Sequence, residues 1–320
     1  MKITNALENK RYRLRTDEDG YIIGDNDLLD SVKSQKVEII FLGGSTTECL
    51  HVDEGERFPY LISTKIKYTN GQPIRILNGG VAGNNVMHSV IKFLAKGVKY
   101  KPKRVVMMHA INDLVLFFKT LSYWTAPNSR SLVSQKARND FYELGESIKN
   151  LLIPNIPINV LSGLSQTGMS DEWVGYRHFT PTFNEVKSTL YNQFKPALKV
   201  FVETSKSFGS EPILMTQFNR LTENDKLTRS LYEKDMKFPY EQFVILYRLA
   251  NSIVRDVARE NDIFLIDLDR QVEKTAEYMY DSVHLNTQGS RLVSDIISTS
   301  LLYRYPLDYT HGTTAVSKNQ

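Results

Sequence analysis

Cysteine is nearly absent from this sequence: Cys49 is the single one among 320 residues. A lone cysteine excludes an intrachain disulfide and a cysteine-rich zinc site. Apolar runs are also short, and none reaches the length of a membrane-spanning helix. The segment Met1–Arg15 lacks the apolar stretch of a secretory signal peptide. As it stands, the sequence predicts a soluble, cytoplasmic protein without a membrane span.

Charge of one sign is not in large excess either. Lys and Arg number 40 and Asp and Glu 36, which gives a formal net charge of +4 that is spread along the chain. Nucleic-acid binding is therefore not expected. Hydrophobic residues make up 41% of the chain and charged residues 24%, and there is no internal repeat or low-complexity tract. This composition and length predict a globular protein with one large domain or two modest ones.

Short apolar runs alternate with segments of helical spacing along most of the chain. The runs predict buried strands at 37–42, 74–77, 104–108, 212–216 and 263–268. Helices are predicted at 58–68, 86–99, 183–207, 241–260 and 287–303. This alternation predicts a parallel sheet covered on both faces, which is a three-layer α/β/α sandwich. We expect an N-terminal arm over 1–35, the main domain over 36–305 and a C-terminal tail over 306–320.

One stretch interrupts the alternation. Residues 115–182 are rich in aromatic side chains and contain both tryptophans, Trp124 and Trp173. The stretch follows the carboxyl end of a predicted strand, where ligands bind in sheets of this kind. We interpret it as an insertion that caps the site, and the alternative is a second small core that does not contact substrate.

The first predicted strand ends in Gly43-Gly44-Ser45-Thr46-Thr47-Glu48. A small-residue turn between a strand and a helix presents Ser45 at the helix N-terminus, which suits a nucleophile whose reaction forms an oxyanion. The alternative is a capping box, because Ser45 and Glu48 have the S-x-x-E spacing. The phosphate-loop pattern is absent, and Thr47 breaks the G-x-S-x-G pattern of the α/β-hydrolase fold.

The second and third strands are followed by groups that can donate hydrogen bonds. Gly83 lies in a glycine-rich loop whose backbone N–H can approach a ligand, although the loop also fits a plain turn before a helix capped by Asn84 or Asn85. Asn112 follows the third strand and carries an amide that can complete an oxyanion hole. Its alternative role is that of a turn or cap residue.

Asp281 and His284 follow the last predicted strand and are three residues apart, so one turn brings them together. A carboxylate there can hold the imidazole tautomer while the other ring nitrogen acts as a base. The alternatives are a surface Asp–His pair, a helix start capped by Asn286 or Thr287, or a metal pair without a third ligand. Taken together, the groups that follow the strands are the components of acyl transfer.

This combination resembles the SGNH (GDSL-like) hydrolase superfamily, in which Ser, Gly, Asn and His lie in separate sequence blocks. Gly43-Gly44-Ser45 matches the first block with Gly44 in place of Asp, and Gly83 matches the second block's glycine. Ala110-Ile111-Asn112-Asp113 matches G-x-N-D with Ala110 in place of Gly, and Asp281-Ser282-Val283-His284 matches D-x-x-H. The resemblance spans roughly residues 37–303 and implies a flavodoxin-like sandwich with a five-stranded parallel sheet.

The resemblance implies a role for each matched residue. Ser45 would be the nucleophile, His284 the general base and then acid, and Asp281 the residue that orients His284. The backbone N–H groups of Ser45 and Gly83 and the side chain of Asn112 would bind the oxyanion. The departure at Ala110 concerns the backbone geometry near Asn112, and the departure at Gly44 is expected to leave the chemistry unchanged.

A serine esterase without a metal or organic cofactor is therefore the leading hypothesis, with a small-molecule or glycan ester as its substrate. The resemblance favours removal of a small acyl group, such as acetyl, from a glycan or glycan precursor. The alternatives are an O-acyltransferase that uses the same residues with a sugar hydroxyl as acceptor, and a catalytically silent module that binds a glycan or a protein. Cys49 is expected in the core, and a structural role is expected for His109.

Overall fold

The computed structural model describes residues 12–24, 30–33, 35–125, 132, 180–222, 229–230, 233 and 238–312. Most of the expected insertion, the beginning of the expected arm and the end of the expected tail lie outside the described residues. The interpretation of the insertion as a cap therefore stays a prediction, and Trp173 lies outside the described residues.

A five-stranded parallel sheet forms the centre of the molecule, with the strand order β3-β1-β4-β5-β6. The five predicted strands are confirmed to within a few residues. Every residue of β1 and of β4 is buried, as expected for a sheet that is covered on both faces. The strands are β1 (Val37–Gly43), β3 (Arg75–Gly80), β4 (Arg104–Met108), β5 (Glu211–Met215) and β6 (Phe264–Ile266).

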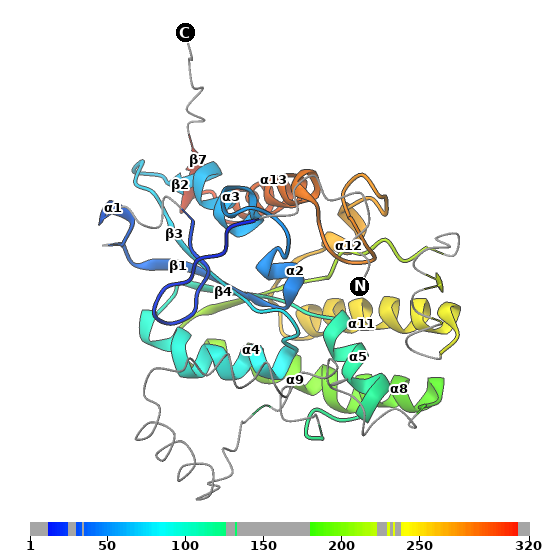
Figure 1. Cartoon of the computed structure of the whole chain (residues 1–320). Coiled ribbons are helices and arrows are strands. Elements are labelled where there is room, and N and C mark those ends of the chain that lie inside the picture. The colour runs from blue at the N-terminus through cyan, green and yellow to red at the C-terminus, as the bar shows by residue number, and fades with distance from the viewer. Residues whose placement is uncertain are drawn as a thin grey trace, which may run out of the picture.

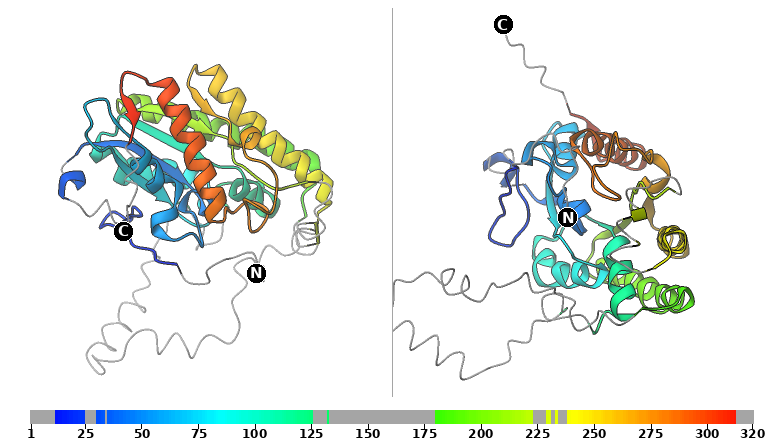
Figure 2. Two further views of the ribbon diagram at one scale, coloured as in Figure 1. Left: turned by 90° about the horizontal axis from the view of Figure 1, so that it is seen from above. Right: turned by 45° about the vertical axis from the view of Figure 1, so that its right-hand side comes forward.

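Helices cover both faces of the sheet and confirm the three-layer sandwich (Figure 1). Alternate residues of β1 serve the two faces: Ile39 and Phe41 belong to one core cluster, and Ile40 and Leu42 to the other. The first core packs against α3 (Phe58–Lys65) and α13 (Thr287–Arg304). The second core packs against α4 (Val86–Lys92), α9 (Lys195–Ser207) and α11 (Tyr240–Glu260) (Figure 2).

Two of the predicted helices contain a π-helical turn. The helix predicted over 86–99 comprises α4, a π-helical turn at Phe93–Gly97 and a 3-10 turn at Val98–Tyr100. The helix predicted over 183–207 comprises α8 (Phe183–Thr189), a π-helical turn at Leu190–Phe194 and α9. Pro196 accounts for the second turn, because its nitrogen has no hydrogen to donate to the preceding turn.

Two features differ from the sequence predictions. Residues 66–68 were predicted to end a helix, but they form β2 (Ile66–Tyr68), which pairs antiparallel with β7 (Tyr309–His311). Residues 111–120 form α5 (Ile111–Thr120), so the first six residues of the expected insertion belong to a helix of the main domain. Phe117 and Phe118 of α5 are buried in the core, and this burial explains why the helix continues directly from β4.

The described part of the expected arm packs against the edge of the sheet. The backbone N–H of Ile22 donates to the carbonyl oxygen of Asn78 on β3 at 2.8 Å, and Tyr21 is fully buried. Lys92 Nζ on α4 donates to the carbonyl oxygen of Gly20 at 3.0 Å. This segment therefore covers the outer edge of β3. Among the described residues, no helix is long and apolar enough to cross a membrane.

A buried charge cluster closes the end of the sheet at which the parallel strands begin. Arg104, at the first position of β4, is 2% exposed and lies 2.6 Å from Glu38 Oε1 on β1. Its guanidinium also reaches Asp308 at 2.5 Å, donates to the Tyr309 hydroxyl and lies over the ring of Tyr305 at 3.7 Å from the ring centroid. These contacts attach the β2–β7 ribbon to the central sheet.

Replacing Arg104 by Met should strongly destabilise the fold, because the buried Glu38 carboxylate then loses its cationic partner and keeps the hydroxyl donors of Tyr68 and Tyr309. We expect a loss of about 3–5 kcal/mol in the free energy of unfolding. Urea unfolding followed by circular dichroism measures this change. Lys103→Ala is the control, since Lys103 binds the same Asp308 at 2.8 Å from an exposed position and should cost about 0–1 kcal/mol. Equal losses in the two variants would contradict a special role for the buried pair.

Candidate active site

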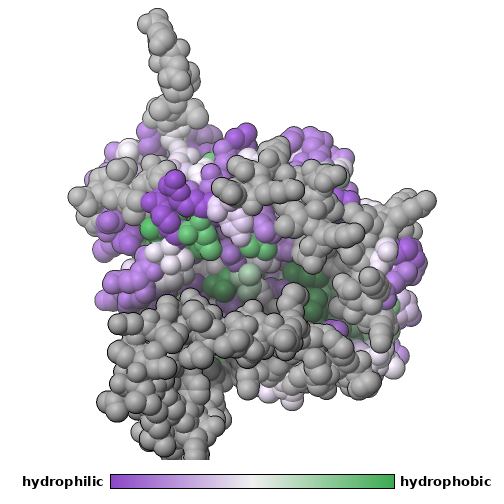
Figure 3. All heavy atoms as spheres, viewed as in Figure 1, coloured by the Kyte–Doolittle hydropathy of each residue, from purple (hydrophilic) through white to green (hydrophobic). Residues whose placement is uncertain are grey.

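Ser45 begins helix α2 (Ser45–Glu48) directly after β1. The short helix lies against the strand ends because glycines leave room for it. A Cβ on Gly43 would lie 2.0 Å from Thr47 Oγ1, and a Cβ on Gly80 would lie 2.2 Å from the Glu48 nitrogen. The prediction that the Gly-Gly turn presents Ser45 at a helix N-terminus is confirmed. Figure 3, which is viewed as in Figure 1, shows hydrophobic residues in a recess across the middle of the molecule.

The capping-box alternative for Ser45 is wrong. Gly44 occupies the N-cap position of α2 and no side chain caps this helix end. Glu48 does not reach back to the helix start, and its Oε2 instead accepts a hydrogen bond from the backbone N–H of Ala82 at 2.5 Å. The Glu48 side chain is therefore engaged away from the helix end, and the Ser45 hydroxyl contacts His284 instead. Burial raises the pKa of Glu48, and this hydrogen bond partly offsets that effect.

Ser45, His284 and Asp281 form a continuous chain of short contacts. Ser45 Oγ lies 2.7 Å from His284 Nε2, and His284 Nδ1 lies 2.7 Å from Asp281 Oδ2. The other carboxylate oxygen of Asp281 accepts from the backbone N–H groups of Val283 and His284 at 2.9 and 2.8 Å. The three side chains are 239 and 3 residues apart in sequence, and the strand ends bring them together as predicted.

The charges and hydrogen bonds around His284 favour the tautomer that carries its proton on Nδ1. Burial works to raise the pKa of Asp281, but the hydrogen bond and charge of His284 and the two backbone N–H groups outweigh it and lower that pKa. An ionised Asp281 accepts the proton on Nδ1, which leaves Nε2 free to accept the Ser45 hydroxyl. The ring of Tyr280 stacks on the imidazole with centroids 5.5 Å apart and planes 7° apart, which restrains the ring's orientation.

Asn112 lies beside the nucleophile turn. It is the second residue of α5, and its Nδ2 donates to the carbonyl oxygen of Asn84 at 2.7 Å. A Cβ on Gly44 would lie 2.4 Å from that nitrogen. A side chain at position 44 would therefore displace the amide from its present position, so Gly44 makes room for Asn112 as it is placed in this structure. An amide carries two N–H donors, and one of them remains for a ligand oxygen.

Gly83 and the loop after β3 are held by neighbours of the triad. Gly83 has a φ of 83°, in the left-handed region that favours glycine. The loop is held on one side by the Glu48 carboxylate at Ala82 and on the other by Asn112 at Asn84. Asn85 then caps α4 by accepting from the backbone N–H of His88, as one of the sequence alternatives predicted. Asn286 likewise caps α13, accepting from the backbone N–H of Gly289 at 2.8 Å.

Two titratable side chains close to Asn112 in sequence, His109 and Asp113, are buried in the core. His109 is 2% exposed, and its Nε2 lies 2.7 Å from Ser89 Oγ, so the structural role expected for His109 is confirmed. Asp113 is fully buried and its Oδ1 accepts from the Tyr123 hydroxyl at 2.5 Å and from the backbone N–H of Val86 at 3.0 Å. Its Oδ2 has no hydrogen-bond partner within the described part of the chain.

Burial gives these two residues opposite pKa shifts. Burial lowers the pKa of His109 to about 3, with a smaller contribution from His88, so the imidazole is neutral. Burial raises the pKa of Asp113 to about 7 despite the hydrogen bonds from Tyr123 and Val86. Cys49 is buried, as expected, and burial raises the pKa of its thiol. No group of three or more His, Cys, Asp or Glu side chains that could hold a metal occurs among the residues that the structure describes.

No protein-family model matches the sequence, and no curated protein matches it. Three solved structures have a similar fold. One is a variant of Axe2, an acetyl xylan esterase from Geobacillus stearothermophilus, with 14% identity and a TM-score of 0.48. The others are the acetyl xylan esterase AlAXEase, with 13% identity and a TM-score of 0.47, and LAE5, an alpha/beta hydrolase enzyme from the metagenome of Lake Arreo, Spain, with 16% identity and a TM-score of 0.46. The alignments cover 83%, 83% and 82% of this chain and 97%, 100% and 94% of the respective structures. Similarity at this level assigns neither a family nor an activity to this chain.

The buried carboxyl of Asp113 should make stability depend on pH. The folded chain keeps this proton up to pH about 7, whereas the unfolded chain releases it near pH 4. Its contribution to stability is therefore present below pH ~4 and is lost as the pH rises towards 7. His109 has the opposite sign, since its folded pKa is lowered and its contribution is lost as the pH falls below about 6.5.

Asp113→Asn separates the two effects. We expect the free energy of unfolding of the wild type, minus that of Asp113→Asn, to fall by up to about 1.4 kcal/mol per pH unit between pH ~4.5 and ~6.5. Urea unfolding at three pH values in this range measures the difference. The matched control is Asp295→Asn, whose carboxylate is exposed and should give a nearly constant difference. A constant difference for Asp113→Asn as well would mean that Asp113 is ionised in the folded protein.

Proposed function

We propose that this protein is a serine esterase that hydrolyses a carboxylic ester through Ser45, His284 and Asp281. The observation that carries the proposal is the pair of 2.7 Å contacts that joins the three side chains at the carboxyl ends of the parallel strands. The resemblance of the sequence blocks to the SGNH superfamily supports the same assignment. Asn112 and Gly83, in the two turns that adjoin Ser45, are proposed as donors to the oxyanion.

The first half of the reaction forms an acyl-enzyme. Ser45 Oγ attacks the carbonyl carbon of the ester while its proton moves to His284 Nε2, and the carbonyl oxygen becomes an oxyanion. The backbone N–H groups of Ser45 and Gly83 and the Asn112 amide donate to that oxygen. The carbon–oxygen bond to the alcohol then breaks, and the alcohol leaves with the proton from His284. Asp281 holds Nδ1 throughout and stabilises the transient imidazolium.

The second half returns the free enzyme. Water takes the position of the departed alcohol, and His284 Nε2 accepts one of its protons as its oxygen attacks the acyl carbon. The second oxyanion is bound by the same donors, the bond to Ser45 Oγ breaks, and the proton returns to the serine. The carboxylic acid leaves. A hydroxyl group of a sugar in the place of this water would make the product a new ester, which is the acyltransferase alternative.

The proposed substrate carries a small acyl group, acetyl in the first instance, on a glycan or glycan precursor. The small acyl group is supported by the close surroundings of Ser45, which is 7% exposed and follows Gly44, where the Asn112 amide leaves no room for a Cβ. The glycan part rests on the family resemblance alone.

Ser45→Ala tests the proposed nucleophile. Hydrolysis of p-nitrophenyl acetate should fall by at least about 10³-fold, because Ser45 is the residue of the proposed triad that forms the acyl-enzyme. Ser63→Ala is the matched control. Ser63 Oγ donates a hydrogen bond to the carbonyl oxygen of Tyr60 within α3, so this substitution should leave turnover unchanged. Circular dichroism and the Tm confirm that both variants are folded. Wild-type turnover in Ser45→Ala would exclude this mechanism.

Asn112→Ala tests the proposed oxyanion donor. We expect kcat to fall by about 10²–10³-fold with a much smaller change in KM, because the lost hydrogen bond is strongest to the charged oxygen. Asn192→Ala, on an exposed helical surface, is the control and should keep wild-type kinetics. A change confined to KM would assign Asn112 to substrate binding instead.

Product analysis distinguishes hydrolysis from acyl transfer. We expect the wild type, supplied with p-nitrophenyl acetate and an excess of a free sugar, to release acetate and p-nitrophenol in equal amounts, because water attacks the acyl-enzyme. Chromatography and mass spectrometry quantify the two products and any acetylated sugar. An acetylated sugar formed in place of acetate would favour the transferase.

A further inference from the structure

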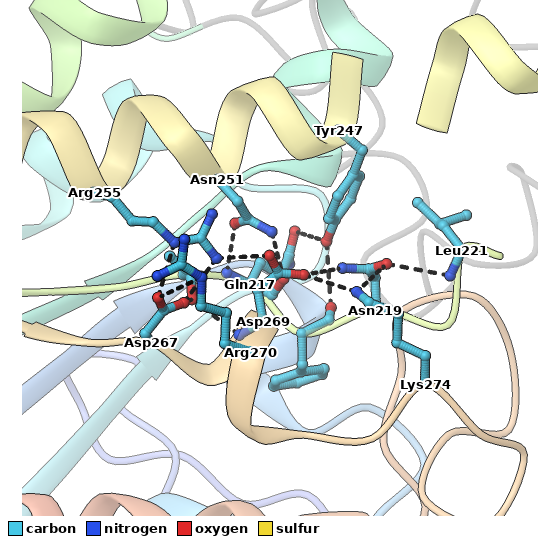
Figure 4. Close-up of polar contacts among 12 residues, drawn as sticks. Gln217, Asn219, Leu221, Tyr247, Asn251, Arg255, Asp267, Asp269, Arg270 and Lys274 are labelled. Atoms are coloured by element: carbon cyan, nitrogen blue, oxygen red, sulfur yellow. Dashed lines mark hydrogen bonds and ion pairs between the residues drawn. The ribbon is translucent and has the colours of Figure 1, made fainter. Parts of the chain in front are cut away.

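Gln217 follows β5 at the same edge of the sheet as the proposed site. It is 2% exposed, and its backbone is clamped by one side chain of α11: the N–H of Gln217 donates to Asn251 Oδ1, and Asn251 Nδ2 donates to the carbonyl oxygen of Gln217, both at 2.9 Å. Figure 4 shows Asn251 and Tyr247 reaching down from α11 to this residue. The position of Gln217 is therefore set by two backbone contacts, independently of its side chain.

The side chain of Gln217 joins two turns that are distant in sequence. Its Oε1 accepts from the backbone N–H of Ile111 at 2.8 Å and from the Tyr247 hydroxyl at 2.8 Å. Its Nε2 donates to Thr46 Oγ1 at 2.8 Å. Ile111 is the residue before Asn112, and Thr46 is the residue after Ser45. One buried carboxamide thus contacts the immediate neighbours of the proposed nucleophile and of the proposed oxyanion donor.

We propose that Gln217 is a positioning residue that sets the placement of Asn112 relative to Ser45. This inference rests on the proposed function. The first N–H groups of a helix have no partner within the helix, so the N–H of Ile111 depends on an outside acceptor. A carboxamide has a donor and an acceptor in one rigid plane, and here each is used on a different turn. Displacement of the reacting groups by about 1 Å can cost about 10²-fold in rate.

The residues behind Gln217 form a network that resists movement. Thr216 Oγ1 donates to Asp267 Oδ1 at 2.8 Å, and Arg255 donates to both Asp267 and Asp269 at 2.7–2.9 Å (Figure 4). Lys274 Nζ binds Asp269 Oδ1 at 2.8 Å. This network ties the segment after β5 to α11 and to the segment after β6, so the carboxamide of Gln217 is presented from a rigid base.

Gln217→Met tests the inference, because Met keeps the length of the side chain and removes its hydrogen bonds. The probe is a fluorophosphonate, which reports on Ser45 and the oxyanion donors without turnover. Ser45 Oγ forms a bond to phosphorus, the phosphorus–fluorine bond breaks, fluoride leaves and the serine proton passes to His284. Intact-protein mass spectrometry gives the labelling rate. We expect Gln217→Met to be labelled about 10²-fold more slowly than the wild type, with a similar loss in kcat and little change in KM.

A double-mutant cycle separates positioning from a general structural role. If Gln217 acts through Asn112, Gln217→Met should slow labelling by less than about threefold when Asn112 is already Ala. Equal factors in the two backgrounds would overturn the inference. Tyr309→Phe is the stability control, since it breaks buried hydrogen bonds to Arg104 and Glu38 at the opposite end of the sheet. It should lower the Tm and leave the labelling rate unchanged.

Thr46 supplies a second test in case Gln217→Met does not fold. Thr46→Val keeps the shape of the side chain and removes the acceptor for Gln217 Nε2, so labelling should slow. Thr46→Ser keeps the hydroxyl and should restore most of the rate. Equal rates for the Val and Ser variants would overturn the inference. If the wild type is neither labelled at Ser45 nor active on p-nitrophenyl acetate, the proposed function fails as well. A labelled wild type and an equally labelled Gln217→Met leave the proposed function standing and refute the inference alone.

Discussion

The close approach of α2 to the strand ends is the constraint on which the rest of the site depends. The helix can lie there only because Gly43 and Gly80 have no side chains, and its first residue then faces the loop that carries His284. Once α2 is placed, Glu48 reaches the Ala82 nitrogen and Gly44 leaves space for the Asn112 amide. Three separate turns are therefore arranged around one short helix, and a methyl group on either strand glycine would move all of them.

The fold could be predicted because buried strands leave a strong local signal, whereas the candidate site residues could be predicted only from their joint placement after those strands. Continuous apolar runs predict buried strands, and the parallel arrangement places whatever follows those strands at one edge. Ser45, Asn112, Asp281 and His284 all follow such strands, and the structure places Ser45 Oγ 2.7 Å from His284 Nε2. Helix boundaries were predicted less well, because the apolar spacing continues through the π-helical turns and through the start of β2.

The remaining features had no local signal. The spacing of Ser45 and Glu48 fits a capping box equally well, and only the loop after β3 shows that Glu48 binds elsewhere. The β2–β7 ribbon joins two three-residue strands from distant parts of the chain, and neither is long enough to show a pattern. Gln217 also follows a predicted strand. A glutamine at such a position does not by itself indicate a role, and the role of Gln217 becomes visible only from its side-chain contacts with Ile111, Tyr247 and Thr46.

The β2–β7 ribbon also has a consequence for the order of events during synthesis. Two partners of the charged pair of Arg104 and Glu38 come much later in the chain: Asp308 follows Arg104 by 204 residues, and Tyr309 follows Glu38 by 271 residues. A nascent chain that has already formed β1 and β4 therefore holds a charged pair whose cover is not yet made. The sheet can assemble vectorially from its first strands, but its charged end is covered only after residues 308 and 309 have emerged from the ribosome and the β2–β7 ribbon has formed.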